Sequence, residues 1–160
     1  MNHAIIDGYN LIYSDKWLSK LMKKDPLIAR DALIDEIQHS IGNSLDVTLV
    51  FDGKFMHEKK SVSRNFRILF SSGGESADDV IKNLIGRAWN RRIITVVTND
   101  LSIIAYAEEC GSRTMNCKDF LSLLRTKKSP PNQTDKENPQ EKPEHITKED
   151  LELLKKWSKE

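Results

Sequence analysis

The sequence predicts an α/β fold: a three-layer α/β/α sandwich around a mainly parallel central sheet. Short runs of β-branched and apolar residues alternate along the chain with segments whose apolar residues have a helical spacing. This alternation implies parallel strands, because each helix carries the chain back across the sheet. Three of the best predicted strands end in an aspartate, and such sheets bind ligands beyond the carboxyl ends of their strands.

The first half of the chain contains two strands and a helix. His3–Ile6 is a short apolar run that stops at Asp7-Gly8, which predicts a strand followed by a turn. Apolar residues recur four apart within Leu27–Ile41 and predict an amphipathic helix. Val47–Phe51 is rich in apolar and β-branched residues and stops at Asp52-Gly53, so it predicts a buried strand and a second turn.

The second half continues the alternation. Phe66–Phe70 predicts a strand, and Ser76 is placed to cap the next helix, with Asp79 completing a capping box. Ile93–Thr98 is the clearest buried strand, and Asn99-Asp100 ends it. The remaining predicted elements are a helix that runs to Glu109 and ends at Gly111, a strand at Arg113–Met115 and a helix at Lys118–Arg125.

Composition divides the chain into one domain and a tail. Residues 1–126 form the predicted globular domain, with the apolar periodicity of a single core. Residues 127–146 hold four prolines among polar residues and predict a flexible linker. Residues 147–160 predict an amphipathic helix, capped at Thr147, that packs on this domain or on another molecule.

The bulk properties predict a globular cytoplasmic protein. Of the 160 residues, 38% are hydrophobic and 31% are charged, which favours a packed core over disorder. No apolar run approaches the roughly 20 residues that cross a bilayer, and the N-terminus lacks a basic leader. Cys110 and Cys117 form neither a CxxC motif nor a zinc array. The net charge of +1 favours no particular class of partner.

Four acidic positions are predicted to meet at one edge of the sheet. Asp7, Asp52 and Asp100 each follow a predicted strand. Asp78 opens the helix that follows another strand. Each position alone has an ordinary explanation, as a turn residue, a helix cap or a partner of the helix dipole. Together the carboxylates repel one another unless a cation neutralises them, and their oxygen ligands favour Mg²⁺ or Mn²⁺ over zinc.

Neutral polar residues flank these aspartates. Asn10 and Asn99 are placed to orient a carboxylate, a water molecule or a phosphate, and Ser102 lies near the same edge. For all three, turn and capping roles are equally open.

Four segments resemble, in order, the motifs of the NYN family of PIN-like nucleases, and the closest branch is the YacP type. The segments are Ile6–Ile12 (IDGYNLI), Val50–Gly53 (VFDG), Glu75–Ile81 (ESADDVI) and Val97–Asp100 (VTND). The DGYN segment is fairly specific and FDG alone is weak, but the ordered set is strong. The resemblance covers roughly residues 1–125.

The resemblance implies a PIN-like fold and Mg²⁺- or Mn²⁺-dependent cleavage of RNA phosphodiester bonds. By position, the metal-binding catalytic carboxylates would be Asp7, Asp52, Asp78 and Asp100. Asn10 would be the associated polar residue, while Asp79 and Glu75 are less secure members of the site. Some relatives of this branch act on messenger RNA at the ribosome, which makes both of them candidate partners.

A nuclease also needs cations to hold the phosphate backbone. The segment after Asp52 is basic, and we expect it to emerge at the acidic edge and to contact RNA. Its candidate residues are Lys54, Lys59, Lys60, Arg64 and Arg67.

Other functions fit the sequence less well. An aspartyl phosphatase normally has a second aspartate two residues after the first, where this chain has Tyr9. A phosphoacceptor domain needs an acidic pair after its first strand and a lysine after a late strand, and neither is evident. A catalytically inactive RNA- or ribosome-binding module remains open, although concentrated negative charge disfavours RNA binding.

Overall fold

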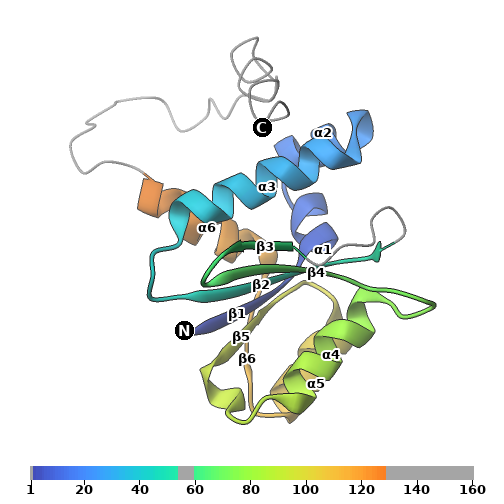
Figure 1. Cartoon of the computed structure of the whole chain (residues 1–160), viewed down its shortest axis with the longest axis vertical. Coiled ribbons are helices and arrows are strands. Elements are labelled where there is room, and N and C mark those ends of the chain that lie inside the picture. Colours follow the sequence, from blue (N-terminus) through green and yellow to red (C-terminus); the bar gives the residue numbers. More distant parts are fainter. Residues whose placement is uncertain (1, 54–59, 129–160) are drawn as a thin grey trace.

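The computed structural model describes residues 2–53 and 60–128. A six-stranded sheet in the order β3-β4-β2-β1-β5-β6 forms its centre (Figure 1). The strands are β1 (His3–Asp7), β2 (Asp46–Phe51), β3 (Lys60–Ser63), β4 (Phe66–Phe70), β5 (Ile94–Val97) and β6 (Arg113–Met115). All neighbouring pairs are parallel except β3 and β4.

Helices cover both faces of the sheet, which confirms the predicted α/β/α sandwich (Figure 1). One face carries α1 (Gly8–Tyr13), α2 (Lys16–Lys24), α3 (Pro26–Ser40) and α6 (Cys117–Lys128). The other carries α4 (Ala77–Arg87) and α5 (Leu101–Glu109), and a short 3-10 helix, η2 (Arg91–Ile93), precedes β5. None of the described helices is long and apolar enough to cross a membrane.

The three central strands, β1, β2 and β5, are largely apolar because both of their faces are buried. In β1, Ala4 and Ile6 pack into the cluster beneath α1, α2, α3 and α6, while Ile5 packs into the cluster beneath α4 and α5. All three side chains are fully buried. Burial of one large aliphatic side chain contributes about 1.5–3 kcal/mol, so the strands at the centre anchor the fold.

The chain reverses its direction across the sheet between β1 and β5. From β1 it passes to β2 on one side, and from β5 it passes through α5 to β6 on the other. Ile6 pairs with Val97 in the register of these two strands. A parallel sheet opens at such a point, and ligands bind in the resulting crevice. Asp7 and Asp100 therefore flank the crevice.

Three elements depart from the sequence prediction. Asp7-Gly8 was expected to form a turn, but α1 begins directly at Gly8. Helix α2 was also not predicted. Strand β3 forms an antiparallel hairpin with β4, where a basic loop was expected.

The hairpin places two of the predicted RNA-binding residues away from the acidic edge. Arg64 lies in the turn that precedes β4, and Arg67 pairs with Thr48 near the start of the strands. The expectation that these residues emerge beside Asp52 is therefore not met. Lys54 and Lys59 lie outside the described residues, as does the side chain of Lys60.

Candidate active site

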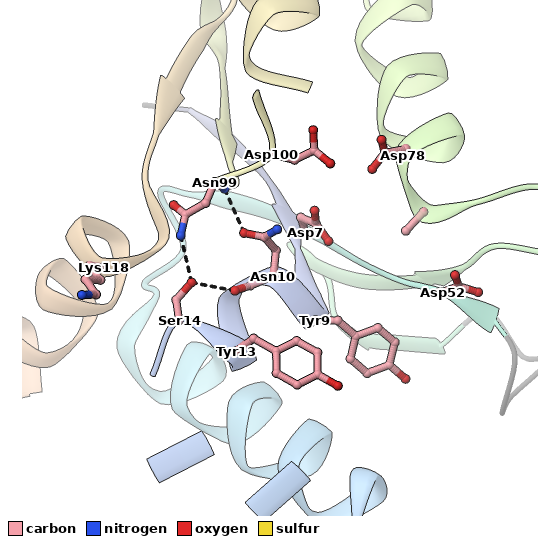
Figure 2. A pocket seen from close by; sticks show the side chains of 11 residues that line it. Asp7, Tyr9, Asn10, Tyr13, Ser14, Asp52, Asp78, Asn99, Asp100 and Lys118 are labelled. Carbon is pink, nitrogen blue, oxygen red and sulfur yellow. Dashed lines mark hydrogen bonds between the residues drawn. The ribbon is translucent and has the colours of Figure 1, made fainter. Parts of the chain in front are cut away.

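The carboxyl ends of the strands open into a pocket of about 700 Å³ (Figure 2). Eleven of the described residues line it: Asp7, Tyr9, Asn10, Tyr13, Ser14, Asp52, Ala77, Asp78, Asn99, Asp100 and Lys118. The four aspartates expected from the sequence are all among them, together with both asparagines. Segments far apart in the chain thus deliver four carboxylates to one hollow.

Asp7 lies at the base of the pocket and is only 8% exposed. The hydroxyl of Thr98, at the end of β5, donates a hydrogen bond to Asp7 Oδ2 at 3.2 Å. Burial raises the pKa of Asp7 to about 6, and the negative charges of Asp78 and Asp100 contribute to the same shift. A cation in the pocket would relieve this cost, because it favours the ionised form.

Asp78 and Asp100 lie at the beginnings of two helices. Asp100 caps α5, since its Oδ1 accepts a hydrogen bond from the backbone N–H of Ser102 at 2.9 Å. Asp78 is in the first turn of α4, and its pKa is raised by burial and by the charge of Asp100. Figure 2 shows both carboxylates on the same flank of Asp7. Because each of the two aspartates lies at the beginning of a helix, the position of that helix fixes the position of its backbone.

Asp52 follows β2 and is held by the loop after β4. The hydroxyl of Ser71 donates to Asp52 Oδ1 at 3.4 Å and accepts from the backbone N–H of Gly53 at 3.0 Å. A Cβ at residue 53 would lie 1.7 Å from the carbonyl oxygen of Ser71, so only glycine fits there. The Asp52-Gly53 pair is thus required by close backbone packing as well as by its place in the pocket.

Asn10 and Asn99 connect the two sides of the crevice (Figure 2). The backbone N–H of Asn99 donates to Asn10 Oδ1 at 2.9 Å, and Asn99 Nδ2 donates to Ser14 Oγ at 3.0 Å. Asn99 Oδ1 accepts from the backbone N–H of Cys117 at 3.0 Å. These bonds join α1, the end of β5 and α6, and they orient the Asn10 side chain, whose Nδ2 donates to none of the residues in the described part of the chain.

Three predicted supporting residues lie outside the lining of this pocket. The Asp79 carboxylate accepts from the backbone N–H of Ser76 at 3.0 Å and completes the capping box of α4. Glu75 accepts from Asn83 Nδ2 at 3.2 Å and lines a smaller neighbouring hollow. Ser102 accepts from Lys82 Nζ at 3.0 Å. Their roles in any reaction stay predictions.

The sequence reasoning missed other residues of the pocket. Tyr9 and Tyr13 come from α1, Lys118 comes from α6, and Thr98 lies beneath Asp7. Because α1 begins directly after Asp7, its turns lie at the carboxyl edge of the sheet. Predicting a helix at this position would therefore have placed Tyr9 and Tyr13 at the pocket. No comparable local signal pointed to Lys118, because its position depends on how α6 packs.

The four aspartates of the pocket offer carboxylate oxygens, which are the ligands that a hard divalent cation prefers. Within residues 2–53 and 60–128, however, no three Asp, Glu, His or Cys side chains converge as a preformed metal site. A bound cation would therefore have to draw the carboxylates together. It would also offset the burial and the neighbouring negative charge that raise the pKa of Asp7 and of Asp78.

Comparison with known proteins agrees with this architecture. A crystal structure of a tryptophan-to-leucine mutant of Rae1 (YacP) from Bacillus subtilis has a TM-score of 0.66 and 25% identity, over 79% of this chain and 77% of that chain. A second Rae1 (YacP) structure has a TM-score of 0.63 and 24% identity, over 79% and 75%. No curated protein sequence matches the chain.

The family comparison reaches further along the chain. The model of the YacP-like NYN domain matches residues 4–159, which includes the tail beyond the motifs found in the sequence. The division of that tail into a linker and a helix stays a prediction, because residues 129–160 lie outside those that the structure describes. The match spans nearly the whole chain, and the chain therefore belongs to the YacP-like NYN domain family.

Proposed function

We propose that this protein is an endoribonuclease that depends on Mg²⁺ or Mn²⁺. Family membership supports a nuclease-like activity on RNA. The observation that carries the finer proposal is the gathering of Asp7, Asp52, Asp78 and Asp100 around one pocket, with Asp7 buried and its pKa raised. An inactive RNA-binding module would gain nothing from carboxylates that repel both one another and a phosphate backbone.

In this proposal the four aspartates hold the cation. A divalent cation would supply charge neutralisation for the phosphodiester and acidify a water molecule that attacks phosphorus. Thr98 positions Asp7, and the cap of α5 positions Asp100. Asn10 Nδ2 is available to donate a hydrogen bond to a phosphate oxygen, because its Oδ1 is already engaged by Asn99.

The cellular substrate forms a further part of the proposal. We propose messenger RNA in the cytoplasm, engaged in association with the ribosome. The support is the resemblance to the YacP-type branch, some of whose members act in that way.

The test compares two adjacent carboxylates. Purified protein is incubated with end-labelled structured and unstructured RNA, with Mn²⁺, Mg²⁺ or chelator, and with or without ribosomes. Asp78→Asn should lower the cleavage rate by roughly a hundredfold or more, because Asp78 lines the pocket. Asp79→Asn is the matched control and should retain most of the activity, because Asp79 caps α4 on the outside.

Asp7→Asn and Asp100→Asn extend the test to the strand ends. Both should abolish metal-dependent cleavage. Cleavage that survives in both variants would show that the active centre lies elsewhere. If the wild-type protein binds RNA but does not cut it under any of these conditions, the inactive binding module becomes the better explanation.

A further inference from the structure

The pocket has two chemically different flanks. Asp78 and Asp100 form an acidic flank, while Tyr9 and Tyr13 lie on the other side of Asp7 (Figure 2). Lys118 is the single cationic side chain among the eleven lining residues. Since Arg64 and Arg67 lie near the opposite edge of the sheet, Lys118 and the tyrosines are the described side chains best placed to hold a substrate.

The two tyrosines differ in how much of each ring is available. The Tyr9 ring packs against Phe51 with its centroid 4.9 Å away, so Phe51 covers part of it. Tyr13, in the last turn of α1, is 62% exposed and has no aromatic partner among the described residues. Most of a large ring therefore faces the solvent beside a polar pocket, where it is accessible to a ligand.

A nucleobase is the ligand that this pairing of ring and cation fits. Bases stack on exposed aromatic side chains, and the phosphates between them pair with lysine. In a duplex the faces of each base are covered by its neighbours, so stacking requires an unpaired nucleotide. The four carboxylates in the same pocket also call for a cation between them and the ligand, and a nucleic acid brings divalent counterions with its phosphates.

We propose that Tyr13 and Lys118 form a nucleotide subsite, in which the Tyr13 ring stacks on an unpaired base and the Lys118 ammonium pairs with a nearby phosphate. The identification of the nucleic acid as RNA rests on the proposed ribonuclease function. The subsite would hold the strand against the acidic flank and would favour cleavage in unpaired segments.

The first experiment measures binding without cleavage. Fluorescence anisotropy follows a labelled single-stranded 12-mer RNA and the matching blunt duplex in the presence of Mg²⁺, with every protein carrying Asp78→Asn so that the RNA stays intact. Tyr13→Ala should weaken single-strand binding by roughly 5- to 150-fold, the range measured for losing one stacked base. Tyr13→Phe should bind like the wild type, because it keeps the ring. Lys118→Gln should bind more weakly and should reduce the dependence of binding on salt.

Matched controls come from exposed side chains outside the pocket. Trp89 is 92% exposed beyond the far end of α4, and Lys24 is exposed at the end of α2. Trp89→Ala and Lys24→Ala should leave single-strand binding unchanged. If either of them weakens binding as much as Tyr13→Ala and Lys118→Gln do, the subsite is overturned in favour of a general surface effect.

A 2-aminopurine base in the RNA reports stacking directly. Its fluorescence should be quenched when wild-type protein or Tyr13→Phe is added and should stay unquenched with Tyr13→Ala. Equal quenching by all three proteins would overturn the subsite, even if cleavage is normal. Failure of the wild-type protein to cleave RNA would instead count against the proposed function, and Tyr13-dependent quenching would still support the subsite.

Discussion

Asp7 combines burial with a neighbourhood of like charge. In the folded protein its pKa is raised from 3.8 to about 6, so the folded state binds this proton more tightly than the unfolded state does. The resulting stabilisation is fully present below about pH 4 and is lost as the pH rises through 6. By that linkage, the ionised Asp7 makes the free energy of unfolding above pH 7 roughly 3 kcal/mol lower than it would be with a neutral side chain at this position.

The Asp7→Asn variant should therefore be more stable than the wild type at neutral and alkaline pH, although it should be inactive as a nuclease. Without divalent cations, we expect the variant to have a free energy of unfolding up to roughly 3 kcal/mol higher than the wild type at pH 8. The difference should shrink toward zero at pH 4. Urea unfolding at the two pH values measures it. Glu109→Gln, which removes an exposed carboxylate at the end of α5, is the control for the loss of a charge elsewhere.

Helix α1 matters because its first residue packs directly on the sheet. A Cβ at Gly8 would lie 2.4 Å from Cε1 of the Phe51 ring, which is fully buried in β2. The helix can begin immediately after Asp7 only because residue 8 has no side chain. This close packing sets the position of Asn10, and therefore also the hydrogen bond that connects Asn10 with Asn99 across the crevice.

Gly8→Ala should disturb both stability and the pocket. We expect the free energy of unfolding to fall by about 1–3 kcal/mol, because neither the helix nor the ring can move freely. RNA cleavage should fall as well, since Asn10 shifts with α1. Gly42→Ala is the matched control, because a Cβ there would meet nothing within 4 Å. Equal urea midpoints for the two variants would contradict the close packing at Gly8.

At the scale of the whole molecule, the pocket links cation binding to folding. A cation that binds the folded protein alone stabilises it by about 2.7 kcal/mol at a hundred times its Kd. Mn²⁺ should therefore raise the melting temperature of the wild type. The increase should be larger at pH 8 than at pH 5, because the cation competes with the proton on Asp7.

The same measurement of the melting temperature with added Mn²⁺, made on the Asp7→Asn variant, shows whether the cation binds in the pocket. The increase in melting temperature should largely disappear in this variant at both pH values. An unchanged increase would place the cation outside the pocket and would remove the physical basis of the proposed metal dependence, whatever the outcome of the RNA assays.

The sequence predicted the parts of the molecule that local patterns determine. Apolar runs that stop at an aspartate identified β1 and β2, and parallel topology then implied that Asp7 and Asp52 would share a pocket. Strand β3 was missed because its sequence, KSVS, is polar enough for an edge strand and lacks an apolar signal. Tyr13 and Lys118 were missed because their positions depend on long-range packing of α1 and α6, which periodicity does not reveal.

The two strands at the edges of the sheet, β3 and β6, are short. Strand β3 has four residues and a register irregularity, and β6 has three. Unpaired backbone groups at a sheet edge are templates on which a second molecule can add a strand, and short or irregular edges offer few of them. The protein should accordingly tolerate high concentrations without edge-to-edge aggregation, and substitutions that lengthen β6 should erode that tolerance before they affect activity.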